Sequence, residues 1–178
     1  MIATEKSIRI AGVVGDSIVD GPGLRMTIFF QGCEHCCEGC HNPQALPMNG
    51  GRVDTVEGLL AEIDANPLLT GVTFSGGEPL LRAGVLIPLA EGVTARGLDL
   101  AIYTGWTIED IFADGDEYVL SLLGYASVLV DGPFVLEEKS LLLPYRGSKN
   151  QRILDAKKTL AERRAVLVDG LGWVEKGL

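Results

Sequence analysis

Short apolar runs alternate along the chain with segments in which apolar residues recur at helical spacing. An apolar run bounded by turn residues predicts a buried strand, and apolar residues at i, i+3, i+4 and i+7 predict a helix with one buried face. The expected strands are residues 8–14, 24–30, 71–74, 100–103, 126–130 and 152–154. The expected helices are a segment from residue 56 that ends before Asn66-Pro67, then 79–95, 107–123 with a break near Gly115, and 156–164.

This order of elements indicates an α/β sheet in which successive strands run parallel. A closed eightfold barrel takes about 250 residues, whereas this chain has 178. We therefore expect a single domain over residues 1–178, built as an open, partial (β/α) barrel with a mostly parallel sheet, shorter than a full TIM barrel. Such folds place their ligand-binding residues at the C-terminal ends of parallel strands, so the segments that follow the strands form the candidate site.

The loop after the second expected strand contains every cysteine of the chain. Residues 31–42 read QGCEHCCEGCHN, with cysteines at 33, 36, 37 and 40. Thiolates this close together are typical ligands of a metal centre, because each is a soft anion and a short loop can wrap several around one inorganic group. Three of them, Cys33, Cys37 and Cys40, fit the spacing C-x3-C-x2-C.

Three kinds of site compete for this loop. A disulfide is disfavoured, because adjacent cysteines pair poorly and a chain of 178 residues with 47% hydrophobic residues does not need staples to fold. A structural zinc site usually takes two short pairs of ligands well apart in the sequence. An iron–sulfur cluster with three protein ligands is favoured. Fully protein-ligated 4Fe–4S clusters use four cysteines, so three would leave one iron open for chemistry.

Further motifs accompany the cysteine loop in a fixed order. They are DGPGLRMTIFF at 20–30, SGGEPL at 75–80, YTGW at 103–106, VLVDGPF at 128–134 and RGSKNQR at 146–152. The pattern CxxxCxxC resembles that of the radical S-adenosylmethionine (SAM) family. The finer form C-x-H-x-C-x-G-C-x-N, together with the other motifs, resembles the activating proteins of anaerobic ribonucleoside-triphosphate reductase over most of the chain.

The resemblance implies a 4Fe–4S cluster on Cys33, Cys37 and Cys40, whose open iron binds SAM. Reductive cleavage of SAM would give methionine and a 5′-deoxyadenosyl radical, which would generate a glycyl radical on the large subunit of an anaerobic ribonucleoside-triphosphate reductase. The alternative is an activase of another glycyl radical enzyme, such as pyruvate formate-lyase. A radical SAM enzyme for a small molecule and a non-catalytic metal-binding module are further alternatives. A flavodoxin- or ferredoxin-type electron donor is also implied, and a homodimer is left open.

The resemblance assigns SAM binding to residues that follow the later strands. Two glycines allow a ligand to lie against the backbone, a glutamate offers a carboxylate to an ammonium group, and a proline suits the first position of a helix. A threonine at a strand end could bond the SAM carboxylate or ribose, and a strand-end aspartate could bind a cation; a turn or helix cap is the alternative for both. These residues are Gly76, Gly77, Glu78, Pro79, Thr104 and Asp131.

Four other residues carry expectations of their own. Cys36 stands where the family is variable and is expected to be a free thiol. His35 is not expected to be a ligand, since a histidine beside a cluster more often hydrogen-bonds a sulfide or a backbone carbonyl. His41 is expected to be an ordinary loop residue. Arg25 is either a structural ion-pair partner or a charge near SAM.

The formal net charge of −9 argues against broad nucleic-acid binding. The charge is uneven, because residues 139–178 carry nine Lys/Arg and four Asp/Glu, a balance of +5, against six and twenty, or −14, in the remainder. This basic C-terminal segment is either a solvated helix face or a docking surface for an acidic partner or phosphates. The first residues, MIATEKSIRI, do not resemble a signal peptide, and no stretch is long enough to span a bilayer. A reducing cytoplasm is therefore the expected location.

Overall fold

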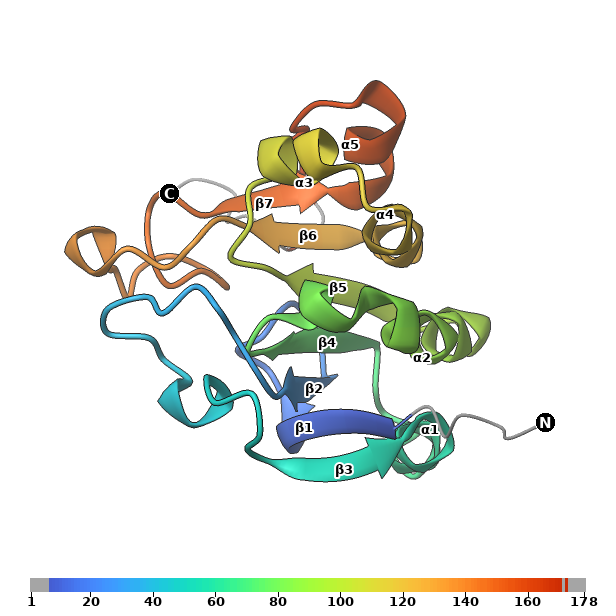
Figure 1. Ribbon diagram of the computed structural model, residues 1–178. Coiled ribbons are helices and arrows are strands. Elements are labelled where there is room, and N and C mark those ends of the chain that lie inside the picture. Colours follow the sequence, from blue (N-terminus) through green and yellow to red (C-terminus); the bar gives the residue numbers. More distant parts are fainter. Residues whose placement is uncertain (1–6, 171, 173–178) are drawn as a thin grey trace.

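One open sheet of seven strands organises the computed structural model, which describes residues 7–170 and 172 (Figure 1). The strand order is β3-β1-β2-β4-β5-β6-β7. The strands are β1 (Ser7–Ser17), β2 (Arg25–Phe30), β3 (Arg52–Thr55), β4 (Gly71–Gly76), β5 (Asp99–Tyr103), β6 (Val128–Asp131) and β7 (Arg152–Asp155). Each strand expected from the apolar runs is present, and β3 is an additional strand that the sequence did not predict.

The four central strands of the sheet, β2, β4, β5 and β6, run parallel. Phe30 pairs with Gly76, Phe74 with Ile102, and the last residue of β5 with Val130, so the C-terminal ends of these strands meet at one edge. β1 pairs antiparallel with β2 and β3, and β7 pairs antiparallel with β6. The sheet ends at β3 and β7 without closing. The expected open α/β fold is confirmed, with its parallel part in the centre and antiparallel strands at both sides.

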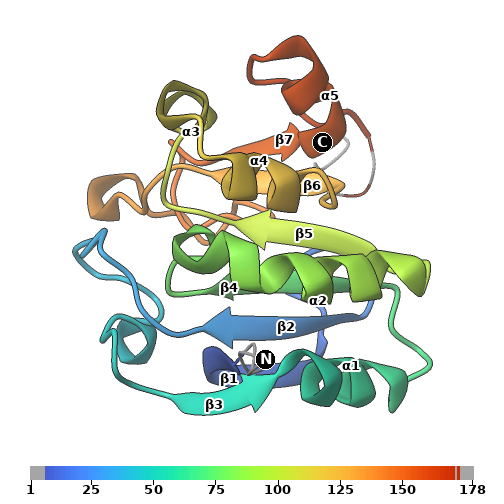
Figure 2. The same cartoon turned by 45° about the vertical axis from the view of Figure 1, so that its right-hand side comes forward.

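Most of the helices follow the strands as the periodicity predicted. They are α1 (Val56–Asp64), α2 (Ala83–Ala95), α3 (Ile108–Asp114), α4 (Glu117–Leu123) and α5 (Ala156–Glu162), with the short 3-10 turns η1 (Pro43–Ala45), η2 (Pro79–Arg82) and η3 (Leu136–Glu138). The segment expected as one helix over 79–95 begins as η2 and continues as α2. Figure 2 shows α1, α2 and α4 lying across one face of the sheet. Among the described residues, no helix is long and apolar enough to cross a membrane.

Side-chain caps and a glycine define where the helices begin and end. The Thr55 hydroxyl accepts a hydrogen bond from the amide of Gly58 at the start of α1. Thr107 and Asp110 form a capping box at the start of α3, in which each side chain meets the backbone of the other residue. Gly115 then ends α3 with a φ of 71°, a left-handed conformation that glycine adopts without strain. The expected break near this glycine is therefore confirmed.

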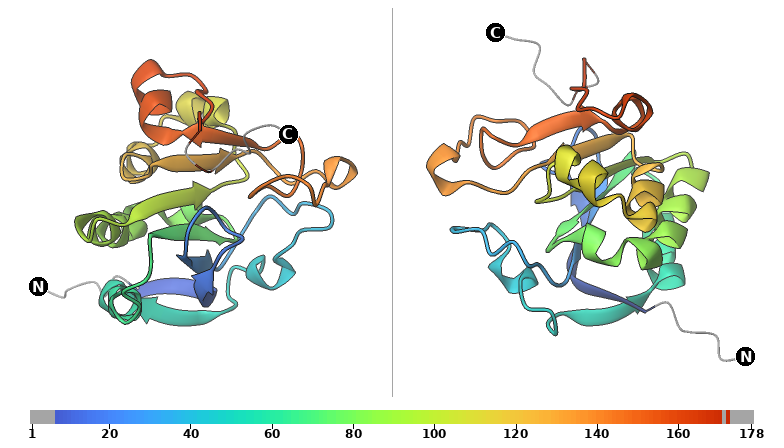
Figure 3. Two further views of the ribbon diagram at one scale, coloured as in Figure 1. Left: turned by 180° about the vertical axis from the view of Figure 1, so that it is seen from behind. Right: turned by 45° about the horizontal axis from the view of Figure 1, so that its top comes forward.

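The main core lies between the helices and the face of the sheet that they cover. Phe74 of β4 and Ile102 of β5 pack there with Leu86 and Leu89 of α2. Alternate residues of the same strands point to the opposite face, where Ala101, Val128, Val130, Ile153 and Val168 form a second, smaller cluster. Figure 3 shows the loops that follow β2 and β6, residues 31–51 and 132–151, extending side by side beyond the C-terminal edge of the parallel strands.

Arg25 lies at the start of β2, at the end of the strand away from the cysteine loop. Its side chain is only 1% exposed and forms a 2.7 Å ion pair with Asp99. Its Nε donates to the hydroxyl of Thr73 at 2.8 Å, and Nη2 donates to the carbonyl of Val72 at 2.8 Å. These contacts join β2, β4 and β5 at their N-terminal edge. Of the two alternatives left open by the sequence, the structure supports the structural ion pair.

We expect Arg25→Met to lower the free energy of unfolding by about 3 kcal/mol, because removing one partner leaves a carboxylate without its cation. Asp99 keeps a side-chain exposure of 33%, which places the loss at the lower end for such pairs. Urea unfolding followed by circular dichroism measures the change. Arg96→Met is the matched control, since Arg96 pairs with Asp64 on the surface and exposed pairs contribute little. Equal losses in the two variants would contradict a structural role for Arg25.

Candidate functional site

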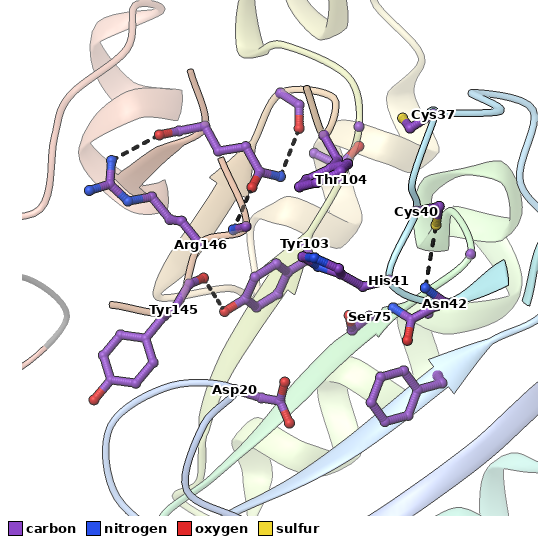
Figure 4. Close-up of a pocket in the computed structure, with 18 of the residues that line it drawn as sticks. Asp20, Cys37, Cys40, His41, Asn42, Ser75, Tyr103, Thr104, Tyr145 and Arg146 are labelled. Atoms are coloured by element: carbon purple, nitrogen blue, oxygen red, sulfur yellow. Dashed lines mark hydrogen bonds between the residues drawn. The ribbon is translucent and has the colours of Figure 1, made fainter. Parts of the chain in front are cut away.

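A cavity of about 710 Å³ opens at the edge where the parallel strands end. Its walls come from the loops that follow β2, β4, β5 and β6, which carry the sequence motifs described above, and from the end of β1 and the turn after it. Figure 4 shows Cys40, Tyr103 and Thr104 around this space. The lining includes Cys33, Cys37, Cys40, Ser75, Gly76, Gly77, Tyr103, Thr104, Gly105, Gly132, Phe134, Tyr145, Arg146, Gly147 and Gln151. Parallel pairing therefore brings the motifs together, as expected from the strand order.

The three cysteines of the C-x3-C-x2-C pattern share this cavity. Cys33, Cys37 and Cys40 are each partly exposed and line it, whereas Cys36 is exposed and does not. Cys36 has a left-handed backbone with a φ of 50°, which is uncommon for a residue other than glycine. Burial raises the pKa of the Cys33 thiol. The structure thus places three of the four thiols in the cavity lining, and their ligation of iron stays a prediction.

The residues present fit an iron–sulfur cluster with a ligand beside it. Thiolates are the ligands that such clusters take, and three of them border one cavity together with two glycines. Within residues 7–170 and 172, no group of three or more His, Cys, Asp or Glu side chains converges closely enough to hold a single metal ion. Three thiols at the border of a cavity of about 710 Å³ are compatible with a cluster and an organic molecule beside it.

Gly76 and Gly77 line the cavity together with the three thiols, and they also touch the neighbouring strand. The amide of Gly77 donates to the carbonyl of Phe30 at 2.8 Å, and the next amide, of Glu78, donates to the carbonyl of Gly32 at 2.8 Å. A Cβ at Gly76 would lie 2.4 Å from the Phe30 nitrogen, and a Cβ at Gly77 would lie 2.2 Å from the Gly32 oxygen. The pair exposes backbone to the cavity, as predicted, and also lets this turn join the start of the cysteine loop.

The Glu78 side chain is buried behind the cavity wall, with 2% of the residue exposed. Its Oε2 accepts hydrogen bonds from the hydroxyl of Thr104 at 3.0 Å and from the amide of Gly105 at 2.8 Å, and it lies 2.8 Å from Nε2 of His35. Its Oε1 accepts from the amide of Leu80 at 3.0 Å and so caps η2. Contact between Glu78 and an ammonium group stays a prediction. His35 meets a carboxylate instead of the expected sulfide or backbone carbonyl.

Pro79 and Thr104 occupy the positions that their sequence context predicted. Pro79 is buried and begins η2. Thr104 lines the cavity at the end of β5, and its hydroxyl accepts from the amide of Trp106 at 3.1 Å while donating to Glu78. The hydroxyl thus forms a turn cap, which was one of the two alternatives, and a contact with SAM stays a prediction.

Asp131 is fully buried at the end of β6 and does not line the cavity. Its Oδ2 accepts from the amide of Ile108 at 2.8 Å, and its Oδ1 accepts from Nε of Arg152 at 2.9 Å. Hydrogen bonds to Asp131 and Glu109 raise the pKa of Arg152, so this guanidinium stays charged. The aspartate therefore joins β6, α3 and β7 as a cap and an ion pair, and its predicted contact with a cofactor remains untested.

The sequence did not single out Tyr103 and Tyr145, which line the outer part of the cavity. The hydroxyl of Tyr103 donates to the carbonyl of Tyr145 at 2.7 Å. Burial, and next the charge of Asp20, raise the pKa of Tyr103, so the phenol stays protonated near neutral pH. The sequence feature that could have identified Tyr103 is its position at the end of a strand, directly before Thr104. His41, expected to be an ordinary loop residue, packs on Phe134 with ring centroids 4.6 Å apart.

Exposed apolar side chains lie in the lining of the cavity or next to lining residues in sequence. Ile18 and Val19, after β1, are 71% and 72% exposed, and Leu141 and Leu142, in the loop after η3, are 90% and 89% exposed. Val19 and Leu141 line the cavity itself. We call these four residues the apolar rim. Exposed leucines and isoleucines that cluster beside a cavity often mark a site of protein contact.

Comparisons with known proteins agree with this geometry. The chain matches the family model described as a 4Fe-4S single cluster domain over residues 19–154. It is 34% identical over 144 residues to the anaerobic ribonucleoside-triphosphate reductase-activating protein of Vibrio cholerae, covering 76% of this chain and 90% of that one. It is 36% identical over 142 residues to the protein of the same name from Salmonella typhi, covering 75% and 90%.

A second group of relatives is similar over a shorter stretch. The pyruvate formate-lyase-activating enzyme of Clostridium pasteurianum is 42% identical over 101 residues, which cover 54% of this chain and 42% of that enzyme. The long matches confirm the resemblance drawn from the motifs. The chain belongs to the family of anaerobic ribonucleoside-triphosphate reductase-activating proteins.

Proposed function

We propose that the protein is a radical SAM activase that generates a glycyl radical on an anaerobic ribonucleoside-triphosphate reductase. The observation that carries this proposal is the cavity in which Cys33, Cys37 and Cys40 meet the glycine pair after β4. The three thiolates would hold a 4Fe–4S cluster, and SAM would lie between the cluster and the backbone of Gly76 and Gly77. The relatives that match over 90% of their own length are named as activating proteins of this reductase.

A reduced cluster, when bound, would supply the electron that cleaves SAM into methionine and a 5′-deoxyadenosyl radical, and this radical would take a hydrogen atom from a glycine α-carbon and leave as 5′-deoxyadenosine. The chain's own residues bind, orient and enclose these groups. The thiols would hold the iron, and the glycine backbone would contact the methionine part of SAM; Tyr103 and Phe134 line the same cavity. A glycine is a suitable target because its radical is stabilised by two flanking amides and is not shielded by a side chain.

The shape and the chemistry of the cavity mouth favour a polypeptide substrate. The four residues of the apolar rim are exposed, two of them line the cavity, and exposed apolar side chains become buried when a protein partner docks. A small polar metabolite would leave them in water. The partner segment is therefore the glycine-bearing part of the reductase. A flavodoxin- or ferredoxin-type donor, a cytoplasmic location and a homodimer complete the proposal.

The alternative partner is another glycyl radical enzyme, such as pyruvate formate-lyase. A pyruvate formate-lyase-activating enzyme shares 42% identity with this chain over 101 residues, and this carries the alternative. The matched part is less than half of that longer enzyme, whereas the reductase activators are matched over 90% of their length. The difference in coverage favours the reductase.

The first prediction concerns the reaction itself. The protein, purified without oxygen and reconstituted with iron and sulfide, should release 5′-deoxyadenosine from SAM when dithionite is added. With an anaerobic ribonucleoside-triphosphate reductase present, electron paramagnetic resonance should detect a glycyl radical. Absence of 5′-deoxyadenosine from a cluster-loaded sample would contradict the proposal, and a radical on pyruvate formate-lyase alone would transfer it to the alternative partner.

The second prediction tests the ligand set. Cys37→Ala should abolish the 4Fe–4S cluster, because two thiolates from this loop cannot hold it, whereas Cys36→Ala should leave the iron and sulfide content nearly unchanged. Iron and sulfide analysis and the spectrum of the reduced cluster measure both effects. Cys36 is the matched control because it is the neighbouring thiol and lies outside the cavity. The reverse outcome would overturn the assignment of Cys37.

The third prediction tests the apolar rim. The double variant Leu141→Ser/Leu142→Ser should slow glycyl radical formation at limiting reductase by about tenfold or more, because burying one leucine contributes about 1.5–3 kcal/mol and 1.4 kcal/mol is a factor of ten. Release of 5′-deoxyadenosine without the reductase should stay unchanged. Leu68→Ser is the control, since Leu68 is 73% exposed in the loop before β4, at the opposite edge of the sheet. A wild-type rate in the double variant would exclude the rim as the docking surface.

A further inference from the structure

One buried carboxylate joins three of the loops that build the site. Glu78 follows β4, its partner His35 lies in the cysteine loop after β2, and its partners Thr104 and Gly105 follow β5. The fourth partner, the amide of Leu80, belongs to its own turn. Three of these partners meet Oε2 and one meets Oε1, so both carboxylate oxygens take part in holding the loops together.

The ring of His35 is held on three sides. Its Nε2 lies 2.8 Å from Oε2 of Glu78. The ring meets Trp106 edge to face, with centroids 4.8 Å apart and planes at 64°. It also lies directly over the Cα of Gly105, where an added Cβ would come within 2.5 Å of the ring. We call Glu78, Gly105 and Trp106 the histidine socket. Only 15% of the His35 side chain remains exposed.

The position of His35 in the sequence links the socket to the proposed iron ligands. His35 stands between Cys33 and Cys37, so anchoring its ring fixes the middle of the segment that carries two of the three proposed iron ligands. Both sides of the socket come from strand ends that the sheet holds rigidly in register. Groups that orient metal ligands from outside the coordination shell commonly change metal affinity by about 10- to 100-fold when they are removed.

We infer that Glu78 and His35 are positioning residues that hold the cysteine loop in its cluster-binding form before any cluster is present. The inference rests on the proposed function for the identity of the cluster ligands. It gives Glu78 a role different from binding the SAM ammonium group, because its buried side chain meets four protein groups and does not line the cavity. The glutamate then acts through His35 on the loop, and the backbone of the glycine pair is left to contact SAM.

The experiment compares His35→Ala with the rescue variant His35→Gln. The amide nitrogen of glutamine reaches about as far from Cβ as Nε2 of histidine and can donate to the same carboxylate. In reconstituted protein, His35→Ala should lose iron to a chelator about tenfold faster than wild type, and His35→Gln should recover most of this loss. In the cluster-free protein under anaerobic conditions, hydrogen exchange of the amides in residues 33–37 should be faster in His35→Ala. Glu34→Ala, an exposed neighbour in the same loop, should match wild type in both measurements.

A steric variant tests the socket without touching either polar group. Gly105→Ala places a Cβ against the His35 ring and should reproduce the fast iron loss and the fast amide exchange. Combined with His35→Ala it should add nothing further, because the ring that it displaces is already absent. An additive effect would show that Gly105 acts elsewhere and would overturn the socket.

Two other outcomes would also overturn the inference. Wild-type iron loss and amide exchange in His35→Ala would show that the ring positions nothing. Unchanged iron retention with a raised KM for SAM would assign the pair to SAM binding instead. Failure of the proposed function is distinct, because wild-type protein would then bind no 4Fe–4S cluster, while the exchange comparison in cluster-free protein would still report on the socket.

Discussion

Parallel pairing of β2, β4, β5 and β6 is the constraint on which the rest of the molecule depends. It places four loops, separated by as many as about a hundred residues of sequence, at one edge of the sheet. The antiparallel strands β1, β3 and β7 complete the two sides without adding to that edge. Arg25 and Asp99 join the same strands at the other edge, and neither residue lines the cavity. Stability and chemistry are thus assigned to opposite ends of one set of strands.

The glycines at the C-terminal edge of the parallel strands have two structural roles. Gly76 and Gly77 offer bare backbone to the cavity, and they also sit so close to β2 and the cysteine loop that a Cβ would collide with backbone atoms. Gly105 likewise leaves room for the ring of His35, because a Cβ at this position would come within 2.5 Å of the ring. A side chain at any of these positions would therefore push apart loops that are in contact, whether or not a ligand is bound. The absence of a side chain at Gly76 and Gly77 therefore serves both the close packing of the loops and the access of a cofactor to the backbone.

The sequence predicted those features whose signal is local. Apolar runs, helical spacing and turn residues identified six strands and most helix boundaries, and cysteine spacing identified the thiols that share the cavity. β3 was missed because its sequence, RVDT, is mostly polar and lies at an exposed edge of the sheet. The partners of Glu78 were out of reach, because His35 and Thr104 lie 43 and 26 residues away in sequence. A carboxylate after two glycines has the same local pattern whether it binds a ligand or anchors a loop. Asp131 is ambiguous for the same reason, since only the fold brings Arg152 beside it.

The cysteine loop shows why anchoring matters for a chain that must bind a cluster. Residues 31–51 contain little regular structure beyond η1, and ordering a free loop costs about 1–2 kcal/mol per residue. The loop is instead folded back on itself, with the Gln31 side chain donating to the carbonyl of Pro47 at 2.6 Å and the amide of Gly32 donating to the carbonyl of Ala45 at 2.8 Å. Cys33 therefore leaves the sheet from a fixed backbone. Because the loop is ordered when the chain folds, the free energy of thiolate–iron bonding is available for holding the cluster and keeping one iron accessible, instead of being used to organise the loop.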